Sequence, residues 1–261
     1  MGITTPCLNA IDHVINNTPL KAKKGALRVL SVGYPDVLIS KKDLNNYFSI
    51  EPEDLKVHPE SKRILSYHGK TKELEEIFTT ESVLGAMGVK EFVSIDVEAH
   101  EGSEVLVDMN YPVLGQVKDI GEFDIVLDLG TMEHCFNVPQ FMQNLEILCK
   151  PLDGGYIIHW NPFYSINHGF YNFNPTFYKD WYEERSAQLI SLSVWGTSKE
   201  GQKCNVIVPL TDRVPHLDLV NSFNLVIVRN SPKLDEFKYP VQTKYKSFIK
   251  GEKENNGGNN D

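Results

Sequence analysis

The sequence predicts an α/β fold: a doubly wound, mostly parallel sheet with an antiparallel edge near the C-terminus. Short apolar runs alternate with amphipathic stretches over most of the 261 residues. The early runs end at glycine or aspartate, which is typical of buried parallel strands whose carboxyl ends face a ligand. With 41% hydrophobic and 23% charged residues, the chain has the composition of a globular protein, and we expect residues 1–249 to form one domain.

Apolar runs predict the strands. The parallel part is expected at Ala26–Val32, Phe92–Ile95, Val105–Val107, Phe123–Leu129 and Gly155–Trp160, the last ending at Asn161-Pro162. The antiparallel edge is expected at Leu189–Trp195, Cys204–Pro209 and Asn224–Arg229. Buried parallel strands read as nearly continuous apolar runs, and the first five segments fit that description.

Three segments predict helices. Asn137–Lys150 is the clearest, because Asn137 suits the N-cap and Pro139 the first turn. Shorter helices are expected over Thr80–Met87 and from Asn174-Pro175 to about Glu184. The polar region 40–79 gives no clear pattern, and the polar, Gly/Asn-rich tail 250–261 is expected to be disordered.

Charge and composition exclude several classes of function. The net charge is −9, from 26 basic and 35 acidic residues, which argues against nucleic acid as a partner. The chain has no apolar run of membrane-spanning length, and residues 1–20 have no signal-peptide core, so we expect a cytoplasmic protein that binds no membrane. The nucleophile elbow of hydrolases and the P-loop are also absent.

Cysteine usage predicts reduced thiols and no metal site. None of the four cysteines stands in a CxxC pair or fits a zinc template; they are Cys7, Cys135, Cys149 and Cys204. Glu133, His134 and Cys135 are adjacent, but neighbouring residues seldom ligate one ion together.

The predicted strand ends carry the candidate ligand-binding groups. In a doubly wound sheet, ligands bind at the carboxyl ends of the strands where the strand order reverses. The residues at these ends are Gly33 with Tyr34, Asp96, Asp108 with Met109, and Asp128-Leu129-Gly130. Glycine permits close backbone approach, an acid can accept hydrogen bonds from ribose hydroxyls, and Met109 offers a polarizable surface to a ring.

The segment from Phe123 to Trp160 resembles the second half of a class I S-adenosylmethionine-dependent methyltransferase, which has a Rossmann-like sheet. The similarity is carried by the FDIV strand at Phe123, by Glu133-His134, by Lys150-Pro151 and by Gly154-Gly155. The continuation NHGFYNFNPTFY, residues 167–178, resembles the subset associated with sugar and surface-glycan biosynthesis.

The resemblance implies S-adenosylmethionine as cofactor. It implies that Asp96 holds the ribose, that Asp108 and Met109 flank the adenine, and that Asp128 to Gly130 line the methionine end. One departure stands out: where the family has a loop with several glycines, this chain has Gly33-Tyr34-Pro35, with one glycine and no leading acid.

The acceptor side is expected in the region after the fifth strand. His134 and His168 are the candidate general bases, since imidazole titrates near neutrality, whereas His159 is expected inside the strand. Ten aromatic residues lie between Trp160 and Tyr182, in an aromatic-rich insertion (residues 160–185). They either wall a substrate pocket, with Tyr164 and Tyr171 facing the substrate, or pack the insertion or a dimer face.

Two functional hypotheses from different classes follow. The first is a methyltransferase acting at oxygen or nitrogen of a small-molecule or glycan-type acceptor. The second is a non-catalytic, methyltransferase-like binding module, which the reduced glycine loop motivates and which would associate with a partner or itself through the aromatic segment. A nucleotide-linked oxidoreductase is disfavoured, because it too needs a glycine fingerprint.

Overall fold

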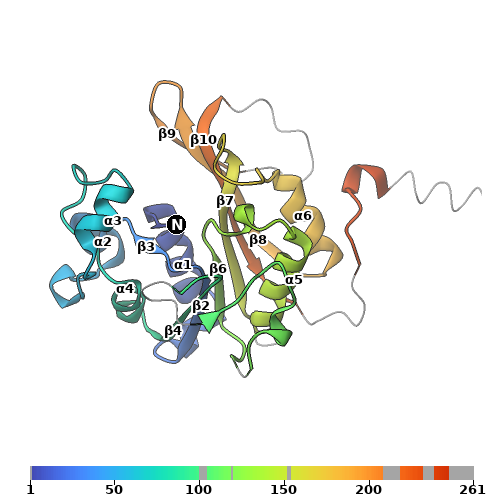
Figure 1. The fold of residues 1–261 in the computed structure, drawn as a ribbon, viewed down its shortest axis with the longest axis horizontal. Helices are drawn as coiled ribbons and strands as arrows, with labels where there is room; N and C mark the ends of the chain where they lie inside the picture. The colour runs from blue at the N-terminus through green and yellow to red at the C-terminus, as the bar shows by residue number, and fades with distance from the viewer. Residues whose placement is uncertain are drawn as a thin grey trace, which may run out of the picture.

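An eight-stranded sheet forms the centre of the fold (Figure 1). The computed structural model describes residues 2–99, 105–118, 120–151, 154–207, 218–231 and 238–246. The sheet has the order β5-β4-β2-β6-β7-β10-β8-β9. Its strands are β2 (Leu27–Val32), β4 (Val89–Asp96), β5 (Val105–Leu106), β6 (Ile125–Asp128), β7 (Tyr156–Tyr164), β8 (Gln188–Ser198), β9 (Lys203–Ile207) and β10 (Leu219–Arg229).

The topology confirms the predicted fold class. Numbered along the chain, the first five strands of this sheet stand in the doubly wound order 3-2-1-4-5, and all their pairings are parallel. The strand order reverses between β2 and β6, so the carboxyl ends of these two strands mark the switch point. β10 inserts antiparallel between β7 and β8, and β9 pairs antiparallel with β8 at the edge.

Helices cover both faces of the sheet (Figure 1). Leu27 and Val29 of β2 pack on the side of α1 (Thr5–Asn17), whereas Leu30 and Val32 pack on the side of α5 (Val138–Leu148) and α6 (Pro175–Glu184). Alternate residues of a strand face opposite sides, so β2 contributes to two cores at once. Further helices are α2 (Lys41–Phe48), α3 (Ser61–Tyr67) and α4 (Thr80–Ala86), with short 3-10 turns η1 (Pro19–Lys23), η2 (Pro52–Asp54), η3 (Val113–Gly115) and η4 (Met132–His134).

The predicted helix starts are confirmed at two N-caps. The Asn137 side chain accepts a hydrogen bond from the Gln140 N–H, and the Asn174 side chain accepts one from the Thr176 N–H. In both helices a proline follows the cap within the first turn, where its missing N–H breaks no helical hydrogen bond.

Three parts of the chain differ from the expectation or extend it. Helix α1 was not predicted, and the polar region 40–79 contains α2, η2 and α3. The fifth parallel strand does not stop at Asn161-Pro162: β7 runs on to Tyr164. Beyond His159 it pairs with β10 alone, and the ladder carries an irregularity next to Pro162, so the missing N–H is tolerated there.

The N-terminal segment is tied to the exit of β2. β1 (Gly2–Ile3) pairs in parallel with β3 (Asp36–Val37), which follows the loop after β2. All four cysteines are free. No helix among the described residues combines the length and apolar character needed to cross a bilayer. The tail 250–261 lies outside the described residues.

Candidate functional site

Glycines with left-handed backbone stand at the switch point. Gly33, directly after β2, has φ 78°, and Gly130, after β6, has φ 100°. The Gly33 N–H donates to the carbonyl of Ile95 at 2.6 Å, which fixes the β2 exit against the end of β4. A side chain is disfavoured at such φ values, so both exits keep a bare backbone at the carboxyl edge of the sheet.

Asp96, at the end of β4, reaches a cavity of about 280 Å³. Its Oδ1 accepts a hydrogen bond from the Val97 N–H at 2.7 Å. The cavity is also lined by Tyr34 and Asp36 from the β2 exit and by residues of the region 40–79, among them His58 and Arg63. The region that gave no sequence pattern therefore forms one wall of the cavity beside the predicted ribose site.

Tyr34 is held by the start of α4. Its hydroxyl donates to Glu81 Oε2 at 2.8 Å and accepts from the Thr80 N–H at 3.2 Å. Burial, together with the neighbouring Glu81 carboxylate, raises the pKa of Tyr34. The phenol oxygen of Tyr34 is thus hydrogen-bonded to α4, and the aromatic ring is the part of Tyr34 that lines the cavity.

Asp108 and Met109 lie in the turn after β5 and make hydrogen bonds within the protein. The Asp108 carboxylate accepts from both the backbone and the side-chain nitrogen of Asn110, at 2.9 and 2.8 Å. The Met109 side chain is 3% exposed, and its carbonyl accepts from Asn144 of α5 at 3.1 Å. The structure therefore places the Met109 thioether in the core beneath α5, and the open part of this strand end is backbone and the Asp108 turn.

Asp128 organises the loop after β6 from inside the protein. Its Oδ1 accepts the Thr131 and Met132 N–H groups at 3.3 and 3.1 Å, and its Oδ2 accepts from His159 Nδ1 at 2.8 Å. The other imidazole nitrogen of His159 lies 2.6 Å from the Tyr182 hydroxyl. These three side chains are fully buried, and Leu129 is 1% exposed. At the predicted methionine end, Asp128 thus shapes the loop through the backbone, and Gly130 is the partly exposed member.

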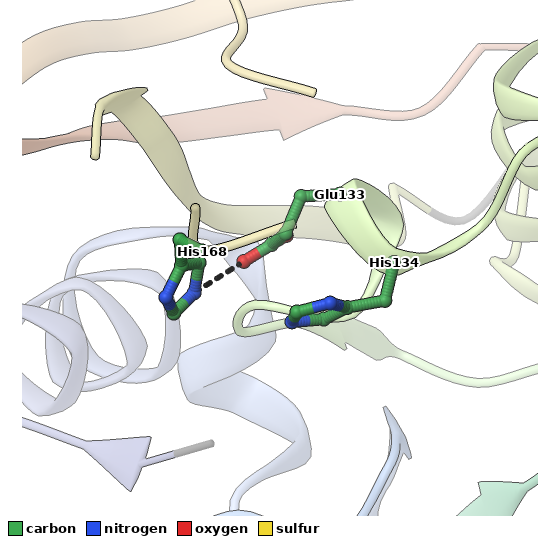
Figure 2. Close-up of side chains that lie close together, drawn as sticks. All are labelled: Glu133, His134 and His168. Atoms are coloured by element: carbon green, nitrogen blue, oxygen red, sulfur yellow. Dashed lines mark hydrogen bonds and ion pairs between the residues drawn. The ribbon is translucent and has the colours of Figure 1, made fainter. Parts of the chain in front are cut away.

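Glu133 and two histidines converge where the loops after β6 and β7 meet (Figure 2). His168 Nε2 lies 3.2 Å from Glu133 Oε1, and the rings of His134 and His168 have centroids 5.3 Å apart. One ligand atom of each of the three residues lies within 4.8 Å of the others. The structure therefore brings together both predicted acceptor-side histidines and adds a carboxylate.

Glu133 is completely buried and was not among the predicted site residues. Its second oxygen, Oε2, accepts from Asn161 Nδ2 at 3.0 Å, and Asn161 Oδ1 accepts from the Tyr178 hydroxyl at 2.8 Å. The hydrogen bond to Glu133 raises the pKa of His168. The available sequence signal was the Glu133-His134 pair, but nothing in the local pattern showed that the glutamate points inward.

Gly169 allows the two loops to touch. A Cβ at this position would stand 2.8 Å from the Glu133 carbonyl oxygen and 3.0 Å from its Cγ. The Phe170 N–H donates to the same carbonyl at 2.8 Å. Gly169 is thus the residue that lets the loop carrying His168 approach Glu133.

Burial and several carboxylates near the strand ends raise the pKa of one thiol, that of Cys135. Burial raises the pKa of Cys135 to about 12, and the negative charges of Asp128, Asp108, Glu133 and Asp96 add to the shift. These acids, which end or follow β4, β5 and β6, therefore all lie close enough to Cys135 to disfavour its thiolate.

The aromatic-rich segment divides into a buried and an exposed half. Phe173, Tyr178, Trp181 and Tyr182 pack in the core against β7 and α5. At the rim, Phe136 and Phe170 are 72% and 66% exposed with ring centroids 5.7 Å apart, and Tyr164 is 48% exposed. The Tyr171 hydroxyl donates to the Phe136 carbonyl at 3.0 Å, so Tyr171 links the aromatic-rich segment to the loop that carries Phe136.

No protein-family model matches the chain, and no curated protein matches it. Among solved structures, it is similar to the CurJ carbon methyltransferase (8% identity, TM-score 0.44, 84% of this chain and 51% of that chain). It is also similar to TehB from Haemophilus influenzae (12% identity, TM-score 0.40, 84% of this chain and 67% of that chain). A further similar structure is the trans-methyltransferase CalH in complex with SAH (12% identity, TM-score 0.43, 87% of this chain and 60% of that chain). The chain spans about half of the CurJ methyltransferase chain. Values this low assign neither a family nor an activity.

Proposed function

We propose that this chain is an S-adenosylmethionine-dependent methyltransferase that acts at oxygen or nitrogen of a small-molecule or glycan-type acceptor. The observation that carries the proposal is the placement of Asp96. It ends the strand next to the switch-point strand β2, lines a cavity, and stands beside the left-handed Gly33. An acid at this position of a doubly wound sheet is suited to bind both hydroxyls of a ribose.

The residues at this edge fit an adenosyl cofactor. Asp96 provides the carboxylate for the ribose, and the bare backbone at Gly33 and Gly130 permits close approach. The Tyr34 ring contributes an apolar wall, and Asp108 stands at the next strand end. When bound, the cofactor supplies a methyl group on a good leaving group, so the protein has mainly to align the acceptor and exclude water.

His168 is the candidate proton acceptor for a hydroxyl acceptor group. Its Nε2 faces the Glu133 carboxylate, which can only accept, so in the neutral ring Nε2 carries the hydrogen and Nδ1 the lone pair. A buried carboxylate that orients an imidazole in this way also favours its protonated form. His134 lies against the same ring, and Tyr164 and Tyr171 at the rim are the proposed acceptor contacts.

Calorimetry with S-adenosylmethionine tests the proposal. We expect wild type to bind the cofactor, Asp96→Ala to bind it at least about tenfold more weakly through loss of the charge-assisted hydrogen bonds, and Asp54→Ala to match wild type. Asp54 is the matched control because it is exposed and does not line the cavity. Absence of binding heat from wild type at millimolar cofactor contradicts the proposal.

The exposed aromatic rim favours a second candidate, the non-catalytic binding module. Phe136 and Phe170 present an apolar surface of the kind that docks a partner or a second copy. This candidate expects a stable homodimer or complex, which Phe136→Ser with Phe170→Ser would dissociate in light scattering. Mass spectrometry of the purified chain separates the two: a stoichiometric adenosyl ligand supports the methyltransferase and rules out the module.

A further inference from the structure

We propose that Glu133, His134 and His168 form a binding site for one divalent transition-metal ion. They come from two loops that are separate in sequence, η4 after β6 and the turn after β7, and Figure 2 shows their side chains converging. Adjacency of Glu133 and His134 alone gave no reason to expect a site; the arrival of His168 from the second loop supplies the third donor.

The donor spacing suits a metal. Two ligands bound at about 2.0–2.1 Å to a tetrahedral ion stand roughly 3.4 Å apart. The distance between Glu133 Oε1 and His168 Nε2 is 3.2 Å, close to that edge. All three donor atoms fall within 4.8 Å of one another, and the exposed His134 side chain has room to move inward.

The charge balance around Glu133 favours a cation. Its side chain is fully buried, and among the described residues its one ion-pair partner is His168, whose charge depends on a proton. No described lysine or arginine pairs with it. A buried carboxylate without a permanent positive partner is costly, and a divalent ion would neutralise it.

The supporting residues already hold the carboxylate in place. Asn161 donates to Glu133 Oε2 and is itself held by Tyr178, so the oxygen facing the histidines keeps its direction. Gly169 and the Phe170 N–H fix the second loop against the Glu133 backbone. Metal sites depend on such outer hydrogen bonds for the orientation of their ligands.

The donor set selects the class of ion. Two imidazoles and one carboxylate suit Zn²⁺, Fe²⁺ or Co²⁺, whereas Mg²⁺ and Ca²⁺ prefer oxygen ligands throughout. Three protein ligands leave a coordination position open, and the exposure of both histidines directs it to solvent. The role of that position rests on the proposed function: an ion there would lower the pKa of an acceptor hydroxyl, whose proton would leave to solvent. His168 would then bind the ion through a deprotonated Nε2 with its hydrogen on Nδ1, in place of the proton-acceptor role proposed for the metal-free site.

Cobalt binding tests the site without any activity measurement. Chelator-treated full-length chain is titrated with Co²⁺, followed by visible absorption and by calorimetry with Zn²⁺. We expect one ion per chain in wild type and at least a tenfold higher dissociation constant in His134→Ala and in His168→Ala. His13→Ala is the matched control, since His13 is exposed on α1, and it should bind like wild type.

The outcomes separate this inference from the proposed function. Thermal melts establish that each variant is folded, and S-adenosylmethionine calorimetry is run on the same samples. A wild type that takes up no Co²⁺ or Zn²⁺, or ligand variants that bind as wild type does, overturns the metal site even where the cofactor binds. Loss of metal in both histidine variants with cofactor binding retained supports it.

Discussion

His159 Nδ1 lies 2.8 Å from Asp128 Oδ2, and neither side chain has any exposed surface. Because a carboxylate can only accept, Nδ1 carries the hydrogen and Nε2 accepts from the Tyr182 hydroxyl. At the end of β6, the buried Asp128 therefore holds the following loop and the His159 imidazole in place. The groups that face the open edge of the sheet come from neighbouring positions.

Substitution of Asp128 should separate shape from charge. Asp128→Ala removes the acceptor of two backbone N–H groups and of His159, and we expect a loss of about 3 kcal/mol of unfolding free energy. Asp128→Asn keeps an acceptor for the loop, and a change of the His159 tautomer restores both imidazole bonds, so we expect a loss of about 1 kcal/mol. Urea denaturation measures both. Equal losses would contradict this assignment of the network.

Gly169→Ala should weaken the site with little effect on the fold. The added Cβ would meet the Glu133 backbone at 2.8 Å, so the loop carrying His168 must move away. We expect at least a tenfold loss of Co²⁺ affinity, with a change of no more than about 1 kcal/mol in stability since the loop is exposed. Gly115→Ala is the control, because its Cβ would meet nothing within 4 Å. An unchanged affinity in Gly169→Ala would show that this close approach is not needed.

The pH dependence of stability should reveal Asp124. Burial of this carboxyl opposes ionisation, but the hydrogen bond from Lys150 at 2.8 Å and that from the Arg28 N–H outweigh burial and lower the pKa of Asp124 below its usual 3.8. A depressed folded-state pKa gives stability that is present above the unfolded value and is lost as the pH falls through the folded value.

Asp124→Asn should therefore cost stability near neutrality and little in acid. We expect a loss of about 1–3 kcal/mol at about pH 7, since the variant leaves the Lys150 ammonium without its buried partner. The difference from wild type should shrink as the pH falls below 3.8, measured by urea denaturation across the range. A difference that stays constant down to about pH 2 would contradict the lowered pKa.

Tyr34→Phe should separate the ring from the hydroxyl. The hydroxyl bonds with Thr80 and Glu81 of α4, so its loss should lower stability by about 1 kcal/mol. The ring that lines the Asp96 cavity is kept, and we expect cofactor affinity to change by less than about threefold, a difference below ~0.7 kcal/mol. Calorimetry with S-adenosylmethionine on the variant measures this. A loss of cofactor affinity as large as that of Asp96→Ala would show that the phenol oxygen contacts the cofactor.

The strand framework was predictable because buried parallel strands leave a strong local signal. β2, β4 and β6 are apolar runs that end at glycine or aspartate, and their positions agree with the expectation to within a few residues. Helix α1 was missed although its signal existed: Leu8, Ile11 and Ile15 recur at steps of three and four on its buried face. The extension of β7 through Pro162 depends on β10, which lies more than fifty residues further along the chain.

The site was predictable only in part, because local sequence does not tell which way a side chain points. Asp96 and Asp128 both end strands, yet Asp96 reaches a cavity and Asp128 is sealed in the core. His134 and His168 could be named from their places after strands, but Glu133 meets His168 only because the loop after β7 folds back onto it. Which groups converge is decided by the packing of distant segments.

The position of β10 has a consequence for synthesis on the ribosome. β8 hydrogen-bonds with β9 and β10, and β10 is the strand that joins this hairpin to β7. Until residues 219–229 have emerged from the ribosome, the five parallel strands can pair, but β7 remains an open edge. β8 and β9 then have no strand that connects them to β7. Open strand edges invite pairing with other chains. The last part of translation is therefore the interval in which the β7 edge is exposed to pairing with other chains.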